Sequence, residues 1–313
     1  MRARILINSQ SGRLGAMPKH DRVALARDVA AVYRDAGYTV DPDRSVSGFN
    51  TTSAPEFRRA AYLASLVAEH IVVLGGDGTF SDVINGVRPA VPTTELPFAH
   101  MTPVTSEYSF IPLGTGNALR HVTGVGPDPL EAAERCAGGS LHPMDMLLCN
   151  GRHKGVLASV GLDGAVLSVY NRLKERGTNG KKTYIRACAE VLPRYRGSDA
   201  RVKVGSDTLD LEHATSLMVM KIPFYGLGMN VAPQARPDSG KLHFVGINDW
   251  YDLAIGMPMA FSPLGNRMGY QKDAEHIRIH TAAPEMLQID GTLIGSGTDF
   301  VFDVLPAHLQ LRY

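Results

Sequence analysis

The chain has 313 residues, 44% of them hydrophobic and 20% charged, a composition typical of a globular protein long enough for two domains. Its 32 lysines and arginines nearly balance its 31 aspartates and glutamates, and a net charge of +1 excludes a global field that recruits nucleic acid or an anionic membrane. Three widely spaced cysteines exclude a disulfide framework, and no apolar run is long enough to cross a bilayer. The N-terminal apolar stretch is too short for a signal peptide, so the sequence predicts a cytoplasmic protein.

Residues 1–138 alternate between strand and helix patterns. Short apolar runs predict strands at 3–8, 38–46, 70–74 and 108–114, and helical spacing predicts helices at 19–38, 54–70, 80–87, 117–124 and 128–139. Such alternation is typical of a parallel sheet covered by helices. The Pro- and Thr-rich stretch from Arg88 to Glu107 has no clear periodicity and is interpreted as a surface loop.

From residue 139 onward the pattern changes to closely spaced short strands. Asn150-Gly151 joins two strand-like runs and is a strong hairpin signal. Further strands are predicted at 201–212, 214–223, 241–248, 276–282, 286–295, 299–305 and 308–313, and helices mostly at 164–177 and 183–195. The apolar stretch Ala254–Gly265 fits either an acyl-chain entrance or a packed core loop. The sequence therefore predicts an α/β domain, residues 1–138, followed by a β-rich antiparallel domain, residues 139–303.

Two glycine-rich loops carry the main functional signal. The first is Gly75-Gly76-Asp77-Gly78-Thr79 and the second is Leu113-Gly114-Thr115-Gly116-Asn117, each between a predicted strand and a helix. Backbone N–H groups and the helix N-terminus make such a loop an anion site. The Asp77 carboxylate would repel phosphates unless a Mg²⁺ ion bridges the two. The alternative interpretation of the loop is a tight turn in which Asp77 caps the next helix. Two such loops favour nucleotide binding.

The two loops in combination resemble the diacylglycerol kinase catalytic-domain family, which includes bacterial lipid kinases and sphingosine kinases. The matching segments are "GGDGTFSDVINGV" and "IPLGTGNALRHV", with weaker matches in "INSQSG", "SVGLDGAV", "YGLGMNVAPQARPDSGKLHF" and "LQIDGTLIG". The resemblance covers nearly the whole chain. It implies an NAD kinase-like and diacylglycerol kinase-like fold, with ATP in a cleft between the two domains and residues 304–313 returning to the first domain.

The resemblance also implies the site residues. Mg-ATP would be bound by Gly75, Gly76, Asp77, Gly78, Thr79, Gly114, Thr115 and Asn117, with Thr51 and Asn8 as further nucleotide contacts and Asp77 as the magnesium ligand. The γ-phosphate would pass to the hydroxyl of a lipid such as diacylglycerol or a sphingoid base. The lipid implies peripheral contact with a membrane, and the oligomeric state, a homodimer included, stays open.

Two departures from the family pattern bear on catalysis and metal binding. The family's late Asp-Gly-Glu motif supplies a glutamate as general base, and here it reads Asp290-Gly291-Thr292. Threonine has no useful pKa near neutrality, which leaves Asp290 as the candidate base. Ser239 stands where many members place a structural metal ligand, with Asp238 one residue earlier, and a simple turn is the preferred interpretation.

Two other functions stay open. A nucleotide-binding regulatory homologue that has lost turnover would account for Thr292. A small-molecule kinase of the NAD-kinase type would share the first glycine loop, although the second loop resembles the lipid-kinase version.

Overall fold

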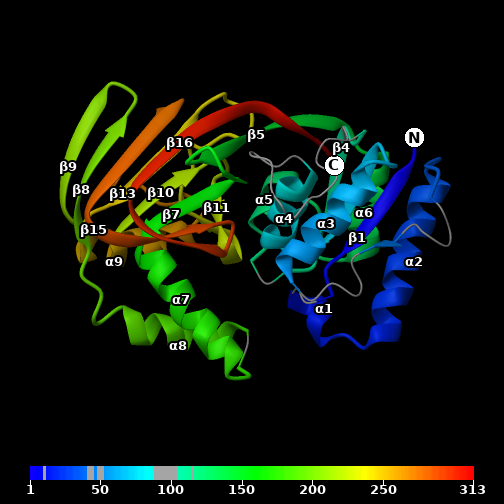
Figure 1. The fold of residues 1–313 in the computed structure, drawn as a ribbon, viewed down its shortest axis with the longest axis horizontal. Coiled ribbons are helices and arrows are strands. Elements are labelled where there is room, and N and C mark those ends of the chain that lie inside the picture. Colours follow the sequence, from blue (N-terminus) through cyan, green and yellow to red (C-terminus); the bar gives the residue numbers. More distant parts are fainter. Residues whose placement is uncertain (10–11, 41–45, 48–52, 88–103, 115, 179) are drawn as a thin grey trace. The chain divides into compact units, whose positions relative to one another are not determined.

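The computed structural model describes residues 1–9, 12–40, 46–47, 53–87, 104–114, 116–178 and 180–313. These residues form two compact units (Figure 1). Unit 1 contains residues 1–144 and 307–313, and unit 2 contains residues 145–306. The predicted loop 88–107 lies outside the described residues except for its last four.

Unit 1 is a parallel sheet with helices. The sheet order is β2 (Val46–Ser47), β1 (Ala3–Ile7), β3 (His70–Gly75), β4 (Glu107–Pro112) and the end of β16 (Thr292–Arg312), where Leu311 pairs with Tyr108. All residues of β3 are buried, as expected for a central parallel strand. The helices are α1 (Gly12–Ala16), α2 (Lys19–Asp35), α3 (Ala54–Ser65), α4 (Asp77–Val87), α5 (Ala118–Thr123) and α6 (Pro129–Gly138).

Local sequence explains where several of these helices begin. Ser53 caps α3 by accepting a hydrogen bond from the N–H of Glu56, and Pro55 follows in the first turn, where its missing N–H costs nothing. Asp128 caps α6 in the same way, accepting from the N–H groups of Leu130 and Glu131. The packed faces of α2 and α6 meet β1, β3 and β4 in one hydrophobic core.

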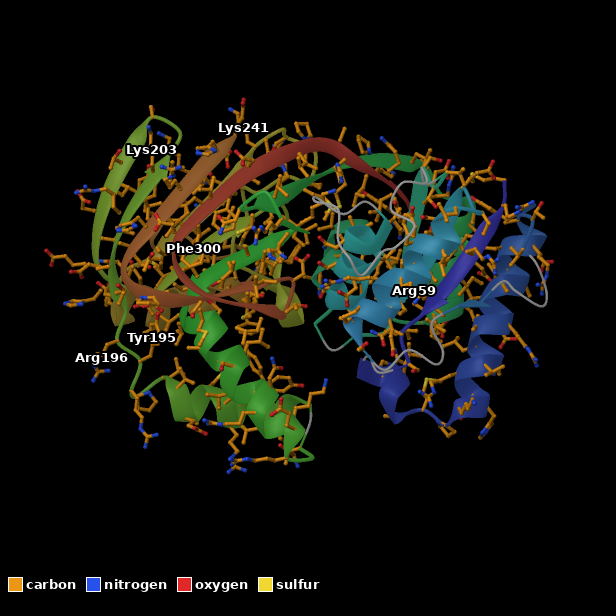
Figure 2. The ribbon with its side chains drawn as sticks, viewed as in Figure 1. Arg59, Tyr195, Arg196, Lys203, Lys241 and Phe300 are labelled. Atoms are coloured by element: carbon orange, nitrogen blue, oxygen red, sulfur yellow. The ribbon has the colours of Figure 1, made fainter. Side chains whose placement is uncertain are left out.

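Unit 2 is mainly antiparallel. Its central order is β14 (Tyr270–Ala274), β13 (Leu242–Ile247), β10 (Ser216–Met220), β7 (Leu157–Gly161), β15 (His276–Ile289) and β16. Strand β8 (Ser198–Val204) pairs with β15 and with β9 (Asp207–Ala214), and a short ribbon is formed by β11 (Phe224–Tyr225) and β12 (Met229–Asn230), which flank the 3₁₀ turn Gly226–Gly228. The helices are α7 (Leu162–Glu175), α8 (Lys181–Val191) and α9 (Trp250–Ala260). Phe300 belongs to the buried core of this unit (Figure 2).

Turn chemistry sets the hairpins of unit 2. Asn150 and Gly151 both have positive φ, 49° and 65°, and join β5 (Leu141–Cys149) to β6 (His153–Gly155), so the predicted hairpin is confirmed. Asp290 and Gly291 repeat this geometry, with φ of 48° and 77°, between β15 and β16.

Four expectations about single elements are wrong. Segments 201–212 and 286–295 are hairpins and not single strands, because turns at Gly205-Ser206 and Asp290-Gly291 separate β8 from β9 and β15 from β16. Segments 299–305 and 308–313 belong to the single strand β16. The packed loop considered for Ala254–Gly265 is largely helix α9, which begins at Trp250 after an N-cap by Asp249.

A buried polar network lies within the sheet of unit 1. His70 is fully buried, with Nδ1 3.3 Å from Glu107 Oε2 and Nε2 3.0 Å from Ser109 Oγ. The Arg312 guanidinium donates to the same Glu107 carboxylate at 2.9 Å and 3.0 Å, and to the carbonyl of Gly139 at 2.8 Å. Burial, the largest cause, lowers the pKa of His70 to about 4, against the opposing effect of Glu107.

This network predicts a loss of stability in mild acid. Between pH about 6.5 and pH about 4 the unfolded chain binds a proton at His70 and the folded chain does not, so the free energy of unfolding falls as pH falls through that window. The shift corresponds to about 3 kcal/mol. Urea unfolding followed by circular dichroism at pH 7.5 and pH 4.5 measures this change in the free energy of unfolding. The stability difference between wild type and His70→Gln should shrink by about that amount at the lower pH, whereas the exposed control His20→Gln should track wild type at both.

Candidate active site

The loops that follow β1, β3 and β4 meet in unit 1. A Cβ placed on Gly114 would lie 2.4 Å from the Cα of Gly76, and a Cβ on Gly12 would lie 2.8 Å from the Cα of Gly114. The Arg13 N–H donates to the carbonyl of Leu113 at 3.0 Å. Because parallel strands end at one edge of their sheet, the loops converge there, and only glycine permits backbones this close.

Asp77 fastens the first glycine loop to the helix that follows the second. Its two carboxylate oxygens accept from the N–H of Ala118 at 2.9 Å and of Leu119 at 3.0 Å, the first residues of α5. The capping alternative thus has a basis in the structure, but the capped helix is α5 and not α4, which Asp77 itself begins. Burial, the largest cause, raises the pKa of Asp77, and these N–H bonds oppose the rise.

Asn117 closes the second loop on itself. Its Oδ1 accepts from the N–H of Gly114 at 2.9 Å and its Nδ2 donates to the carbonyl of Gly114 at 2.8 Å. The backbone of Asn117 is left-handed, with φ of 48°, a conformation that asparagine adopts more readily than most residues. The Asn117 side chain therefore ties the end of this loop to Gly114.

The remaining predicted nucleotide residues fall into two groups. Asn8 Nδ2 lies 3.2 Å from Thr79 Oγ1, and a Cβ on Gly75 would lie 2.6 Å from the Thr79 side chain. Asn8 is therefore a neighbour of the first glycine loop, to which Gly75 and Thr79 belong. Gly78 is in the first turn of α4, and the N–H groups at the very start of a helix have no carbonyl partner within the helix. The predicted contacts Thr51 and Thr115 lie outside the described residues.

The predicted catalytic residues Asp290 and Thr292 lie in unit 2. The Asp290 carboxylate accepts from the buried N–H groups of Val156 at 3.1 Å and Leu157 at 3.0 Å, and Asp290 is 7% exposed. Thr292 pairs with Ile289 across the hairpin. Asp290 thus anchors this turn to β6 and β7, and its role as a base stays a prediction.

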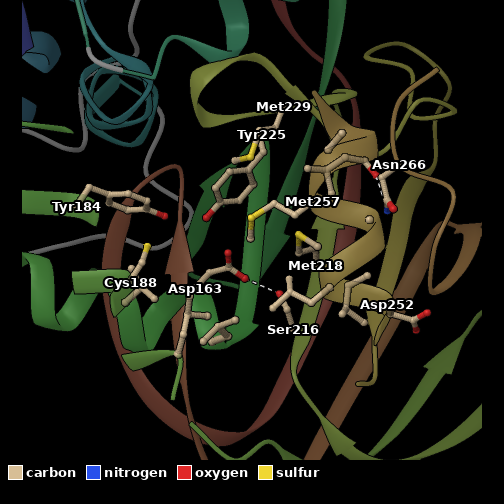
Figure 3. Close-up of a pocket in the computed structure, with 18 residues that line it drawn as sticks. Asp163, Tyr184, Cys188, Ser216, Met218, Tyr225, Met229, Asp252, Met257 and Asn266 are labelled. Atoms are coloured by element: carbon tan, nitrogen blue, oxygen red, sulfur yellow. Dashed lines mark hydrogen bonds between the residues drawn. The ribbon is translucent and has the colours of Figure 1, made fainter. Parts of the chain in front are cut away.

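An apolar cavity in unit 2 contains a charged residue that the sequence patterns did not single out. The cavity has a volume of about 110 Å³ and lies among α7, α8, α9 and β10 (Figure 3). Asp163 faces it and accepts hydrogen bonds from Ser159 Oγ at 2.6 Å and from Ser216 Oγ. Burial and then the nearby Asp163 carboxylate raise the pKa of Tyr225, which also lines the cavity. The sequence signal that could have identified Asp163 is its position, as a carboxylate in the first turn of a helix face that is otherwise apolar.

The Asp-Ser-Gly turn of unit 2 is built around a buried lysine. Lys221 is fully buried, and its Nζ donates to Asp145 Oδ2 at 2.8 Å, to Ser239 Oγ at 3.2 Å and to the carbonyl of Lys241 at 2.5 Å. The Gly240 N–H donates to the same Asp145 oxygen at 2.7 Å. An ammonium group therefore holds this turn together from inside.

Two family models match the chain in succession. The model described as diacylglycerol kinase catalytic domain matches residues 2–149, and the YegS C-terminal NAD kinase beta sandwich-like domain matches residues 156–312. A parallel-sheet domain with glycine loops and an antiparallel β-sandwich domain define this class of protein, so the predicted fold class is confirmed. The chain belongs to the diacylglycerol kinase catalytic-domain family.

Individual relatives agree with this membership. A diacylglycerol kinase of Bacillus subtilis (strain 168) is 29% identical over 205 residues, which are 64% of this chain and 59% of that relative. A solved structure from Bacillus anthracis str. Sterne has a TM-score of 0.74 at 19% identity and covers 100% of this chain and 95% of its own. A diacylglycerol kinase structure from the same strain has a TM-score of 0.68 at 17% identity, covering 100% and 96%. At these identities the structures establish the fold alone.

Proposed function

We propose that the protein is an ATP-dependent kinase that transfers the γ-phosphate of ATP to a hydroxyl group of a lipid. The observation that carries the proposal is the contact between the two glycine loops at Gly76 and Gly114, secured by the Asp77 carboxylate. Family membership supports ATP as the phosphate donor. The apolar cavity of unit 2 supports a lipid as the acceptor.

Each group has a role in this proposal. The N–H groups at the start of α4 hold the phosphates, since a helix N-terminus favours anions. The acceptor hydroxyl attacks the γ-phosphorus, its proton passes to a base for which Asp290 is the candidate, and ADP leaves. Catalysis of this kind depends mainly on positioning and charge stabilisation.

Magnesium fits the first loop as a companion of ATP. The Asp77 oxygens accept N–H bonds from Ala118, Leu119 and the backbone of Asp77 itself, and a carboxylate has about four lone-pair positions, so it can accept a further contact. Asp77 would hold Mg²⁺, which supplies neutralisation of phosphate charge when it is bound. Peripheral contact with the membrane that carries the acceptor completes the proposal.

The test is transfer of labelled γ-phosphate from ATP to hydroxyl lipids in mixed micelles, with diacylglycerol, a sphingoid base and phosphatidylglycerol as separate acceptors. Wild type, Asp290→Asn and Thr292→Glu are run in parallel. A phospholipid product from wild type supports the kinase and names the acceptor. ATP binding without product, with activity appearing in Thr292→Glu, would favour the regulatory homologue instead, and phosphorylation of NAD in place of any lipid would favour the NAD-kinase type.

Gly114→Ala is expected to weaken ATP binding by about tenfold or more, because overpacking a close contact costs about 1–3 kcal/mol. The new methyl group would meet the Gly76 backbone, which cannot turn aside as a flexible side chain can. The measurement is the Kd for ATP by titration calorimetry. Gly138→Ala is the matched control, since a Cβ there meets no atom within 4 Å. Equal ATP affinity in the two variants would contradict the assignment of this loop.

A further inference from the structure

Helix α9 and the turn after it present an apolar face to solvent. Every exposed residue from 251 to 264 is apolar: Tyr251, Ala254, Met257, Pro258, Phe261, Pro263 and Leu264. Tyr251, Phe261 and Leu264 are 67%, 60% and 64% exposed. Asp252 is the only charged residue in this stretch of the sequence. We call these seven residues the α9 face.

A helix that is apolar on its exposed side as well as on its packed side normally contacts a binding partner, either another protein surface or a membrane. The opposite side of α9 lines the cavity through Leu253, Gly256 and Ala260. Met257 belongs to both surfaces, because it lines the cavity and is also 46% exposed (Figure 3). The apolar surface therefore continues from the outside of α9 into the cavity.

The charge beside the α9 face identifies what covers it. Residues 172–196 contain eight lysines and arginines against two glutamates, a net charge of +6, whereas the whole chain carries +1. This segment contains α8, which lies next to α9 because Leu253 packs against the α7–α8 core. Ile185 on α8 is 67% exposed and is followed by the exposed Arg186, and Arg196 points outward beyond α8 (Figure 2).

Apolar side chains next to concentrated positive charge are the pattern of a surface that binds an anionic bilayer. We propose that unit 2 docks on an anionic lipid bilayer, with the α9 face in the acyl boundary and the exposed side chains of Arg186, Arg194 and Arg196 over the head groups. The inference deepens the proposed function by naming the partner surface from which the acceptor is drawn. The described residues include no helix long and apolar enough to cross a bilayer.

The proposal is tested by cosedimentation with vesicles in the absence of ATP. Wild type should bind vesicles of phosphatidylglycerol and phosphatidylcholine in equal parts, and should bind pure phosphatidylcholine vesicles much less. Phe261→Ser combined with Leu264→Ser should weaken binding about tenfold or more, because both side chains would lose their apolar contacts. Leu63→Ser on α3, also an exposed leucine, is the control that should bind like wild type. Arg186→Gln with Arg194→Gln should weaken binding to the anionic vesicles and reduce its salt dependence.

Three outcomes would overturn the proposal: no binding by wild type, unchanged binding by the Phe261→Ser and Leu264→Ser variant, or equal binding to neutral and anionic vesicles. A wild-type dimer that this variant converts to monomer in analytical ultracentrifugation would show that a second copy covers the face. Kinase activity is measured separately in detergent micelles, which need no bilayer docking. A failure of the docking proposal can therefore be told apart from a failure of the proposed kinase function, because vesicle binding can be lost while phosphate transfer in micelles succeeds, or the reverse.

Discussion

Replacing Lys221 by methionine is expected to lower the free energy of unfolding of unit 2 by about 3–5 kcal/mol. The variant would leave the Asp145 carboxylate buried without its cation and would remove the donor shared by Ser239 and the Lys241 carbonyl. Burial lowers the pKa of Lys221, and Asp145 opposes that shift. Urea unfolding followed by circular dichroism measures this loss.

Two further variants separate charge from packing at Lys221. Lys221→Met with Asp145→Asn removes both charges and keeps an oxygen for the Gly240 N–H, so much of the lost stability should return. Lys241→Met at an exposed position of the same turn should change stability by less than about 0.5 kcal/mol (Figure 2). If the double variant were as unstable as Lys221→Met, the buried charge would not be the cause.

Asp77→Asn is expected to reduce phosphate transfer by about 100-fold or more, while the free energy of unfolding falls by only about 1 kcal/mol. Asparagine keeps one oxygen for the N–H groups of Ala118 and Leu119, so the cap of α5 is weakened and not abolished. The negative charge that would hold Mg²⁺ is lost. Activity in mixed micelles and thermal unfolding measure the two effects.

Asp128→Asn is the matched control for Asp77→Asn, because Asp128 also accepts two backbone N–H bonds at a helix start in unit 1. Its expected loss of stability is similar, about 1 kcal/mol, and its expected change in activity is none. Equal activity in the two variants would mean that Asp77 is a capping residue only.

The fold class and the residues of the glycine loops could be predicted from the sequence, because both depend on patterns within short segments of the chain. Strand and helix periods alternate locally, and glycine runs mark where backbones approach. The exact partner of Asp77 could not be predicted, since Ala118 and Leu119 lie some forty positions further along the chain and no spacing rule relates them. The same holds for Lys221 and Asp145, which look like ordinary surface charges in the sequence.

Helix α9 was hidden for a different reason. Helical periodicity is visible only when apolar and polar residues alternate around the axis, and α9 is apolar on its exposed side as well. Gly256 and Pro258 also read as interruptions of a helix, although Pro258 lies in the last turn and Asp249 supplies a regular N-cap. The pattern that concealed the helix is the same one that points to a membrane surface.

The path of β16 has a consequence for how the chain folds during synthesis. Residues 1–144 leave the ribosome first, but the strand that borders β4 is made only after all of unit 2. Until Arg312 arrives, Glu107 and the Gly139 carbonyl lack the guanidinium that joins them. Unit 1 therefore cannot complete its sheet until unit 2 has been synthesised, in contrast to domains that fold one after another from the N-terminus. Until then, the edge of β4 that receives β16 has no strand partner and exposes its backbone N–H and C=O groups.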